Sequence, residues 1–209
     1  MGEGVSRRSF LKTAGASAAV ASLSHAGGAA LGAPEGAPPD ATPALGPDPV
    51  DVTLSVNGKP MKLRLDPATT LLSALRMQCD LTGAKEACDR ASCGACSVIV
   101  DGRLIASCMM LALDAQDAKI TTVEGLANGD TLDPLQTAFV KHDALQCGFC
   151  TPGLVVACRV LLDNNPKPTL AQVKSGLSGN ICRCGTYTNI FNAVLEASGQ
   201  SPIADSAPV

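Results

Sequence analysis

Residues 88–108 read CDRASCGACSVIVDGRLIASC and contain four cysteines. The first three follow the spacing C-x4-C-x2-C, and the fourth comes after eleven further residues. This spacing is typical of a loop that wraps a [2Fe–2S] cluster with three thiolates and receives a fourth from elsewhere in the fold. The expected ligands of this first cysteine group are Cys88, Cys93, Cys96 and Cys108.

The residues between these cysteines suit a bound anion. Two ferric ions, two sulfides and four thiolates sum to a net charge of about −2, which needs hydrogen-bond donors inside a protein. The backbone N–H groups of the loop are the nearest donors, and Gly94 allows the backbone to approach closely. Arg90 is a further candidate donor.

A second cysteine group lies at Cys147-Gly-Phe-Cys150 and Cys182-Arg-Cys184. Zinc ribbons ordinarily combine two C-x2-C halves, so this combination is not their usual pattern. Both pairs precede predicted helices, whose free N–H groups and dipoles favour thiolate charge. We expect Cys147, Cys150, Cys182 and Cys184 to hold a second cluster. Zinc in this group, or disulfides throughout, are the alternatives.

The composition limits the class of protein. The chain of 209 residues is 46% hydrophobic but only 2% aromatic, which predicts an aliphatic core. Its net charge of −3 speaks against a nucleic-acid partner, because such proteins carry a basic surface. Two of its ten cysteines, Cys79 and Cys158, belong to neither group and are expected to be buried core thiols.

The N-terminus resembles an export signal. Residues 6–12 read SRRSFLK, and no charged residue follows from Thr13 to Pro34. This pattern predicts a twin-arginine signal peptide over residues 1–33, since Ala and Gly are weak membrane anchors. A protein exported already folded can bind metal before it meets an oxidising compartment. A Pro- and Ala-rich linker is predicted over residues 34–49.

Residues 50–125 predict a small mixed sheet with one main helix. The dipeptides Asn57-Gly58 and Asp101-Gly102 each separate two runs of alternating apolar residues, which is typical of a β-hairpin. The other predicted elements are a helix over residues 69–78 and a strand over residues 119–123.

Residues 130–198 change to helical spacing and predict four short helices in a compact bundle. Pro134 and Pro152 suit the first turns of two helices. Thr169 is a candidate cap for the third, and the fourth begins at Tyr187. Residues 199–209 are expected to form a tail. The predicted fold class is therefore α+β.

Together these residues resemble a known family. The two cysteine groups, within Gln146-Cys-Gly-Phe-Cys-Thr-Pro-Gly153 and Gly179-Asn-Ile-Cys-Arg-Cys184, resemble those of the small iron–sulfur subunit of molybdenum hydroxylases. These are the xanthine dehydrogenase and aldehyde oxidoreductase enzymes. The likeness spans residues 50–198, and the export signal makes the chain most similar to the subunit of periplasmic aldehyde oxidoreductases. One departure is Ala91, where the family usually has Gly.

The resemblance implies a β-grasp ferredoxin-like domain over residues 50–125 and an all-α four-helix [2Fe–2S]-binding domain over residues 130–198. It implies that the second group holds the cluster nearer the molybdenum cofactor of a large partner subunit. Gln146 and Cys184 would contact the pterin of that cofactor. The first cluster would face an FAD-binding subunit or an external acceptor.

The resemblance also implies a role for the whole chain. It would carry electrons in the periplasm from aldehyde oxidation on the partner subunit, with no catalytic residue of its own. The same role in an isoquinoline-type or other N-heterocycle hydroxylase is the alternative.

Overall fold

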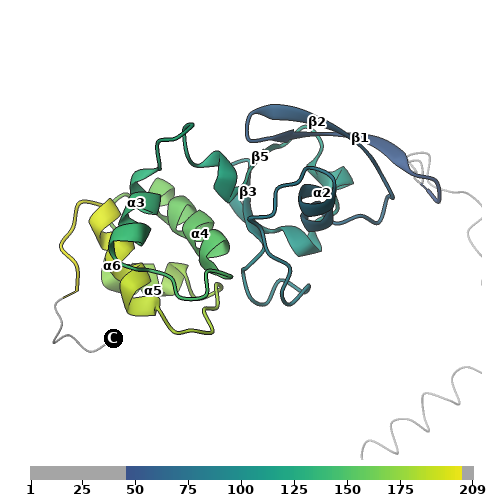
Figure 1. Ribbon diagram of the computed structural model, residues 1–209. Helices are drawn as coiled ribbons and strands as arrows, with labels where there is room; N and C mark the ends of the chain where they lie inside the picture. The colour runs from purple at the N-terminus through teal and green to yellow at the C-terminus, as the bar shows by residue number, and fades with distance from the viewer. Residues whose placement is uncertain (1–45, 204–209) are drawn as a thin grey trace, which may run out of the picture. The chain divides into compact units, whose positions relative to one another are not determined.

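A computed structural model of the chain describes residues 46–203, and Figure 1 shows how their helices and strands follow one another. The predicted signal peptide (1–33), most of the predicted linker (34–49) and the end of the predicted tail lie outside the described residues. Within residues 46–203, every helix is too short or too polar to span a bilayer.

Five strands form one mixed sheet in the order β2-β1-β5-β3-β4 (Figure 1). β1 and β5 are parallel neighbours, and all other neighbouring strands are antiparallel. The strands are β1 (Val50–Val56), β2 (Lys59–Leu65), β3 (Ser97–Val100), β4 (Arg103–Ala106) and β5 (Lys119–Thr121).

Both predicted hairpins are confirmed. Asn57-Gly58 joins β1 to β2, and Asp101-Gly102 joins β3 to β4. All four of these turn residues have positive φ angles, as the tight hairpin turn that matches strand twist requires. The alternation in β1 buries one side of the strand, at Val52, Leu54 and Val56.

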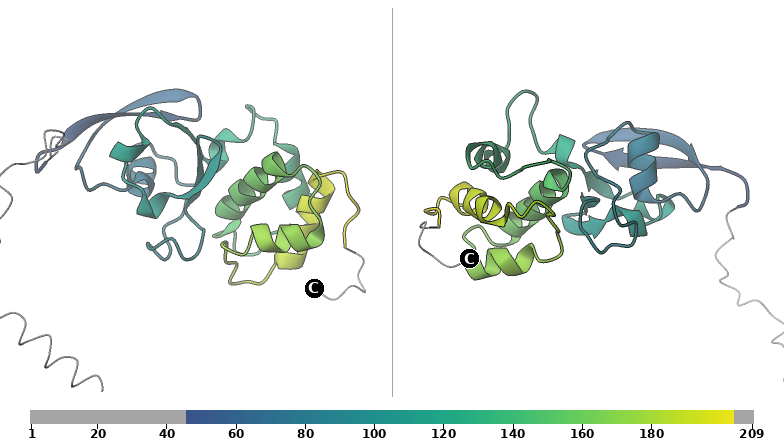
Figure 2. Two further views of the ribbon diagram at one scale, coloured as in Figure 1. Left: turned by 180° about the vertical axis from the view of Figure 1, so that it is seen from behind. Right: turned by 60° about the horizontal axis from the view of Figure 1, so that its bottom comes forward.

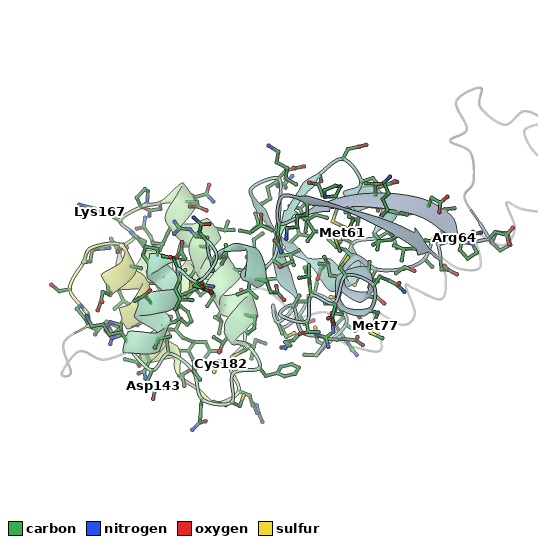
Figure 3. The ribbon with its side chains drawn as sticks, turned by 45° about the horizontal axis from the view of Figure 1, so that its top comes forward. Met61, Arg64, Met77, Asp143, Lys167 and Cys182 are labelled. Atoms are coloured by element: carbon green, nitrogen blue, oxygen red, sulfur yellow. The ribbon has the colours of Figure 1, made fainter. Side chains whose placement is uncertain are left out.

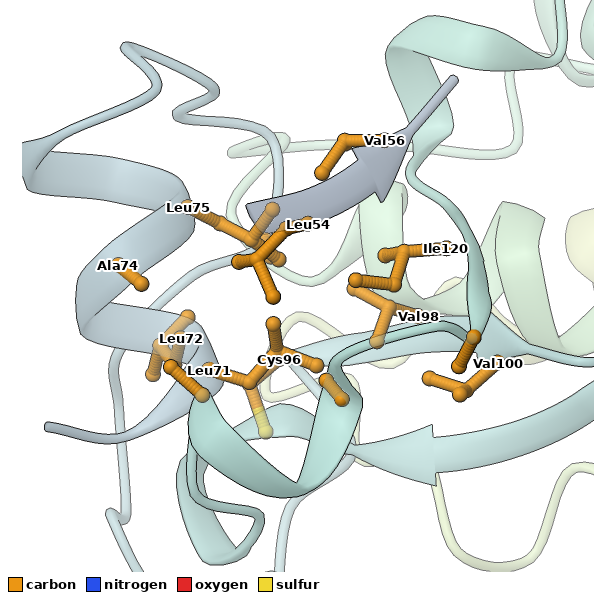
Figure 4. Close-up of a cluster of buried hydrophobic side chains, with 14 of the residues drawn as sticks. Leu54, Val56, Leu71, Leu72, Ala74, Leu75, Cys96, Val98, Val100 and Ile120 are labelled. Atoms are coloured by element: carbon orange, nitrogen blue, oxygen red, sulfur yellow. The ribbon is translucent and has the colours of Figure 1, made fainter. Parts of the chain in front are cut away.

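α2 (Leu71–Met77) covers one face of the sheet and completes the first core (Figure 4). Thr70 caps the helix by accepting a hydrogen bond from the Ser73 N–H. The predicted helix over residues 69–78 is therefore confirmed, with its outermost residues serving as caps and flanks. The buried side chains that meet here are Leu71, Leu72 and Leu75 from the helix and Leu54, Val98 and Ile120 from the sheet.

The four predicted helices are confirmed (Figure 2). They are α3 (Pro134–Lys141), α4 (Thr151–Asn164), α5 (Leu170–Gly176) and α6 (Tyr187–Ala197). Capping boxes begin two of them: Asp133 exchanges hydrogen bonds with Gln136 at α3, and Thr169 does so with Gln172 at α5. A second core lies among the four helices; most of its side chains are aliphatic, such as Leu154, but Phe139 and Phe191 are buried in it as well.

Two element boundaries differ slightly from the prediction. β5 ends at Thr121, because the chain enters a short 3-10 helix at Val123–Gly125. Cys108 lies in another 3-10 helix, Ser107–Met109, which directly follows β4. The first change shortens the strand predicted over residues 119–123, and neither change alters the order of the strands.

The prediction for the two remaining cysteines was half wrong. Cys158 is fully buried in α4, as expected. Cys79 is only half-buried, because α2 has already ended at Met77 and the chain is leaving the core. Its thiol lines a surface cavity together with Met61 and Leu81.

Candidate iron–sulfur sites

The first cysteine group is built on the loop after α2 and on the β3–β4 hairpin. Its thiols lie in two neighbouring pairs, Cys88 with Cys93 and Cys96 with Cys108, in which one thiol affects the pKa of the other. The hairpin brings the second pair together, because Cys96 directly precedes β3 and Cys108 follows β4. The structure therefore assembles all four predicted residues from two separate segments.

Backbone N–H groups point into the first group, as an anion-binding loop requires. The Ala91 N–H donates to the Cys108 Sγ and the Ser92 N–H to the Cys88 Sγ, both at 3.3 Å. Asp89 and Ala91 have φ angles of 50° and 55°, which turn N–H groups toward one centre. The left-handed backbone explains why Gly suits position 91, since a Cβ there is sterically unfavourable.

The surroundings of the first group shift its thiol pKa values in opposite directions. A hydrogen bond from the Arg90 backbone N–H is the largest of the effects that lower the pKa of Cys88 to about 7. Burial raises the pKa of Cys96 to about 11. The Arg90 side chain, expected as a donor, instead donates to the Cys88 carbonyl at 3.0 Å. A bound metal would replace the thiol protons, because the thiolate is the ligand form.

The second cysteine group lies at the starts of two helices, as predicted. Cys150 is the N-cap residue of α4, and Cys182 and Cys184 lie in the turn before α6. Its thiols also lie in two neighbouring pairs, Cys147 with Cys184 and Cys150 with Cys182, in which one thiol affects the pKa of the other. The first of these pairs is exposed, whereas Cys182, labelled in Figure 3, is buried.

Hydrogen bonds and burial also shift the pKa values of the thiols in the second group in opposite directions. The Phe149 backbone N–H lowers the pKa of Cys147. Burial alone would raise the pKa of Cys182, but hydrogen bonds led by the Thr186 hydroxyl outweigh it and lower the pKa to about 7. Burial raises the pKa of Cys150 to about 12. Each pair therefore contains one thiol that loses its proton readily.

The arrangement of thiols fits two-iron clusters. In a [2Fe–2S] cluster each iron takes two of the four thiolates, and each group here contains two thiol pairs. Backbone N–H groups donate to two thiols of the first group, as a bound anionic cluster requires. All ten cysteines lie within residues 46–203, and none of them forms a disulfide there. The paired thiols and these donors fit two-iron clusters.

A buried asparagine joins the two cysteine groups. Asn180 is 5% exposed, and its side-chain nitrogen donates to the carbonyls of Gly94 at 2.9 Å and Gly153 at 3.3 Å. The Ile181 N–H donates to the Cys93 carbonyl at 2.9 Å. A Cβ atom at Gly153 would lie 2.3 Å from the Gly94 oxygen. The loop of the first group therefore rests directly on α4 and on the loop of the second group.

Three residues beside the second group were not predicted from the sequence: Asn180, Thr186 and Tyr187. The Thr186 Oγ1 lies 3.3 Å from the Cys182 Sγ. The Tyr187 hydroxyl accepts a hydrogen bond from the Cys182 N–H at 2.8 Å. The only signal in the sequence was their closeness to Cys182 and Cys184.

One side of the second group is open to other molecules. Gln146 is exposed beside the exposed thiol of Cys147, and the Cys184 thiol is exposed as well. The apolar side chains of Phe149 and Ile181 are 48% and 51% exposed. We call these five residues the exposed face of the second group. A molecule that docks on this face would reach the thiol pair of Cys147 and Cys184 directly.

Family models match both halves of the described chain. Residues 54–126 match the 2Fe-2S iron-sulfur cluster binding domain, and residues 122–195 match the [2Fe-2S] binding domain. Residues 4–24 match the twin-arginine translocation pathway signal sequence. The fold and its sites therefore define the class: an iron–sulfur protein with two [2Fe–2S]-binding domains, exported to the periplasm by the twin-arginine route.

Proteins of similar sequence identify the family within this class. The chain is 42% identical to the aldehyde oxidoreductase iron-sulfur-binding subunit PaoA of Escherichia coli O157:H7, over 94% of this chain and 89% of that protein. It is 45% identical to the nicotine 6-hydroxylase small subunit of Paenarthrobacter nicotinovorans, over 73% of this chain and 92% of that protein. The chain belongs to the iron–sulfur subunits of the xanthine dehydrogenase and aldehyde oxidoreductase family.

A solved structure agrees with this membership. Quinoline 2-oxidoreductase from Pseudomonas putida 86 contains a chain that matches with a TM-score of 0.70 and 38% identity, over 75% of this chain and 99% of that one. For a chain that is the separate iron–sulfur subunit of a molybdenum hydroxylase, the catalytic site lies on a partner subunit. The expected α+β fold, a β-grasp part followed by an all-α part, is confirmed.

Proposed function

We propose that the chain is the electron-transfer subunit of a periplasmic, molybdenum-dependent aldehyde oxidoreductase. Electrons enter from the molybdenum cofactor of a large partner subunit and leave to an FAD-binding subunit or an external acceptor. No residue of the chain acts as an acid, base or nucleophile. The proposed ligand sets are Cys88, Cys93, Cys96 and Cys108 for one [2Fe–2S] cluster and Cys147, Cys150, Cys182 and Cys184 for the other.

The observation that carries the proposal is the direct contact between the two cysteine groups. The Cys93 carbonyl accepts the hydrogen bond of the Ile181 N–H, and Ile181 is covalently bonded to Cys182. One hydrogen bond and a few covalent bonds therefore separate a ligand of one set from a ligand of the other. Each cluster, when bound, supplies one-electron transfer. The protein's part is to hold both sets at a fixed separation, which Asn180 does from a buried position.

The exposed face of the second group supports electron entry at this end of the chain. Cys147 and Cys184 are exposed, so a partner's cofactor can approach them closely. The Gln146 amide offers both a donor and an acceptor, which suits the polar edge of a pterin. Phe149 and Ile181 supply apolar surface that a large subunit would bury.

A second candidate is the same role in an N-heterocycle hydroxylase. The likeness to the nicotine 6-hydroxylase small subunit and to quinoline 2-oxidoreductase favours it. The likeness to the aldehyde oxidoreductase subunit extends further, over 94% rather than 73% of this chain. The aldehyde role is therefore our first proposal.

Substrate-driven reduction of the assembled complex tests this proposal. The complex is purified from the periplasm, oxidised, and mixed without oxygen with an aromatic aldehyde or with quinoline. We expect the aldehyde to reduce both clusters, which is seen as loss of visible absorbance and as two electron paramagnetic resonance (EPR) signals. Reduction by quinoline alone would favour the second candidate. A native complex that contains no molybdenum and is reduced by neither substrate would contradict both candidates.

A further inference from the structure

Thr186 stands at the start of a helix but does not cap it. Three other helices have a cap whose side-chain oxygen accepts a backbone N–H, namely Thr70, Asp133 and Thr169. At α6 the N-cap residue is Thr186, and its hydroxyl makes no such hydrogen bond. The hydroxyl points instead to the Cys182 Sγ, at a distance of 3.3 Å. A residue type well suited to capping is thus used for contact with a thiol.

The contact is held in place from two sides. The Tyr187 hydroxyl accepts the Cys182 N–H at 2.8 Å, which ties the cysteine to the first turn of α6. On the other side, Asn180 and Ile181 fix the preceding residues against the loop of the first group. Cys182 itself is only 6% exposed, so little water competes for its sulfur. The hydroxyl and the sulfur therefore cannot easily separate.

We propose that Thr186 tunes the reduction potential of the second cluster by donating its hydroxyl hydrogen to the Cys182 sulfur. The inference rests on the proposed function, in which Cys182 is a cluster ligand. A ligated thiolate has no proton to donate, so the hydroxyl is the donor in the loaded protein. Reduction adds negative charge to the cluster and its sulfurs, which strengthens this hydrogen bond. The reduced form gains more than the oxidised form, and the potential rises.

The proposal gives Thr186 a role in the direction of electron flow. In the proposed electron-transfer path, the second cluster receives electrons first. A donor on one of its ligands makes it a better acceptor, whereas the first group lies on another loop and is not touched by this hydroxyl. Thr186 is therefore a positioning residue for electron transfer and not a catalytic residue.

Redox titration followed by EPR tests the proposal on the purified, cluster-loaded complex. In Thr186→Val, which keeps the shape but not the hydroxyl, we expect the potential of one cluster to fall and that of the other to stay. At a fixed solution potential the ratio of reduced to oxidised second cluster should fall about threefold to tenfold, and tenfold corresponds to about 59 mV. Thr186→Ser should restore the wild-type value. Thr53→Val, on an exposed strand position, is the matched control and should change neither potential.

The outcomes separate this proposal from the proposed function. Two unchanged potentials in Thr186→Val, with full iron content, would overturn the tuning role alone. Thr186→Ala serves as a second variant if the Val side chain disturbs assembly. If both variants lose the second cluster while Thr186→Ser keeps it, the hydroxyl is needed for assembly and the tuning role is wrong. Fewer than two cluster signals in the wild-type complex would overturn the proposed function, which is electron transfer through two clusters.

Discussion

At the scale of single residues, the fold depends on how closely the first turn of α4 approaches the loop of the first cysteine group. Gly153, in the first turn of α4, contacts the backbone of the loop that carries the first cysteine group. A Cβ atom there would lie 2.3 Å from the Gly94 oxygen and 3.1 Å from the Ala95 backbone. These neighbours are backbone atoms and cannot rotate away, so any side chain at position 153 must push α4 and this loop apart.

Gly153→Ala should therefore destabilise the loaded protein by about 1–3 kcal/mol, as other overpacked sites do. The measurement is the apparent melting temperature, followed by the visible absorbance of the clusters. Gly179→Ala is the matched control, because a Cβ atom at position 179 meets nothing within 4 Å. Equal melting temperatures for the two variants would contradict the close approach.

Asn180 shows why this contact was not predictable from the sequence. Its acceptors, the carbonyls of Gly94 and Gly153, lie 86 and 27 residues away along the chain. No local pattern marks a side chain whose partners come from such distant segments. The eight proposed ligands were predictable because metal sites impose short, characteristic spacings on the residues that form them.

At the scale of elements, one carboxylate ties the end of α3 to α6. Glu196 accepts from the Lys141 Nζ at 2.8 Å and lies 2.6 Å from the His142 Nε2. The hydrogen bond from Lys141, followed by that from His142, lowers the pKa of Glu196. A carboxylate with a lowered folded-state pKa stabilises the fold above its unfolded-state pKa, and this contribution is lost as the pH falls through the folded-state pKa.

Glu196→Gln should therefore lower the melting temperature at pH 7. The difference from the wild type should shrink as the pH falls below about 4, where the wild-type carboxylate becomes protonated. Circular dichroism melts at several pH values measure this difference. Asp130→Asn, at an exposed loop position, controls for the loss of one negative charge. A difference that stays constant from pH 7 to acid would show that the ion pairs do not contribute.

The helices were predictable to within a residue or two because their signals are local. Asp133-Pro134 and Thr169 mark helix starts through hydrogen bonds that span only three residues. The sheet order was not predictable, because β1 and β5 pair in parallel across more than sixty residues, with Ser55 opposite Lys119. Cys79 was misplaced for a related reason: the sequence shows the end of α2 but not which side of the following loop faces the core.

At the scale of the whole molecule, export and cofactor assembly are linked. The match of residues 4–24 to a twin-arginine signal implies that the chain crosses the membrane after folding. Replacing Arg7 and Arg8 by Lys should keep the chain in the cytoplasm, because the route depends on the arginine pair. Cell fractionation measures this, with Lys12→Arg as the control. If the large subunit has no signal of its own, it should be retained too, and its continued export would contradict joint transport.

The chain can transfer electrons from one partner to another only if both cysteine groups hold a cluster. Each half of the described molecule contributes one core and one group of four thiols, and the contact around Asn180 connects the groups. A chain with a single loaded group would accept an electron but have no second site to pass it to. Electron transfer through the chain therefore requires that the native protein contain both clusters.

The most direct test is the iron and acid-labile sulfide content of the complex as isolated, combined with EPR of its reduced form. We predict about four iron atoms and four sulfides for each copy of this chain, and two distinct S = 1/2 signals. Zinc in place of iron, about two iron atoms with a single signal, or disulfides between the eight proposed ligands would contradict the account.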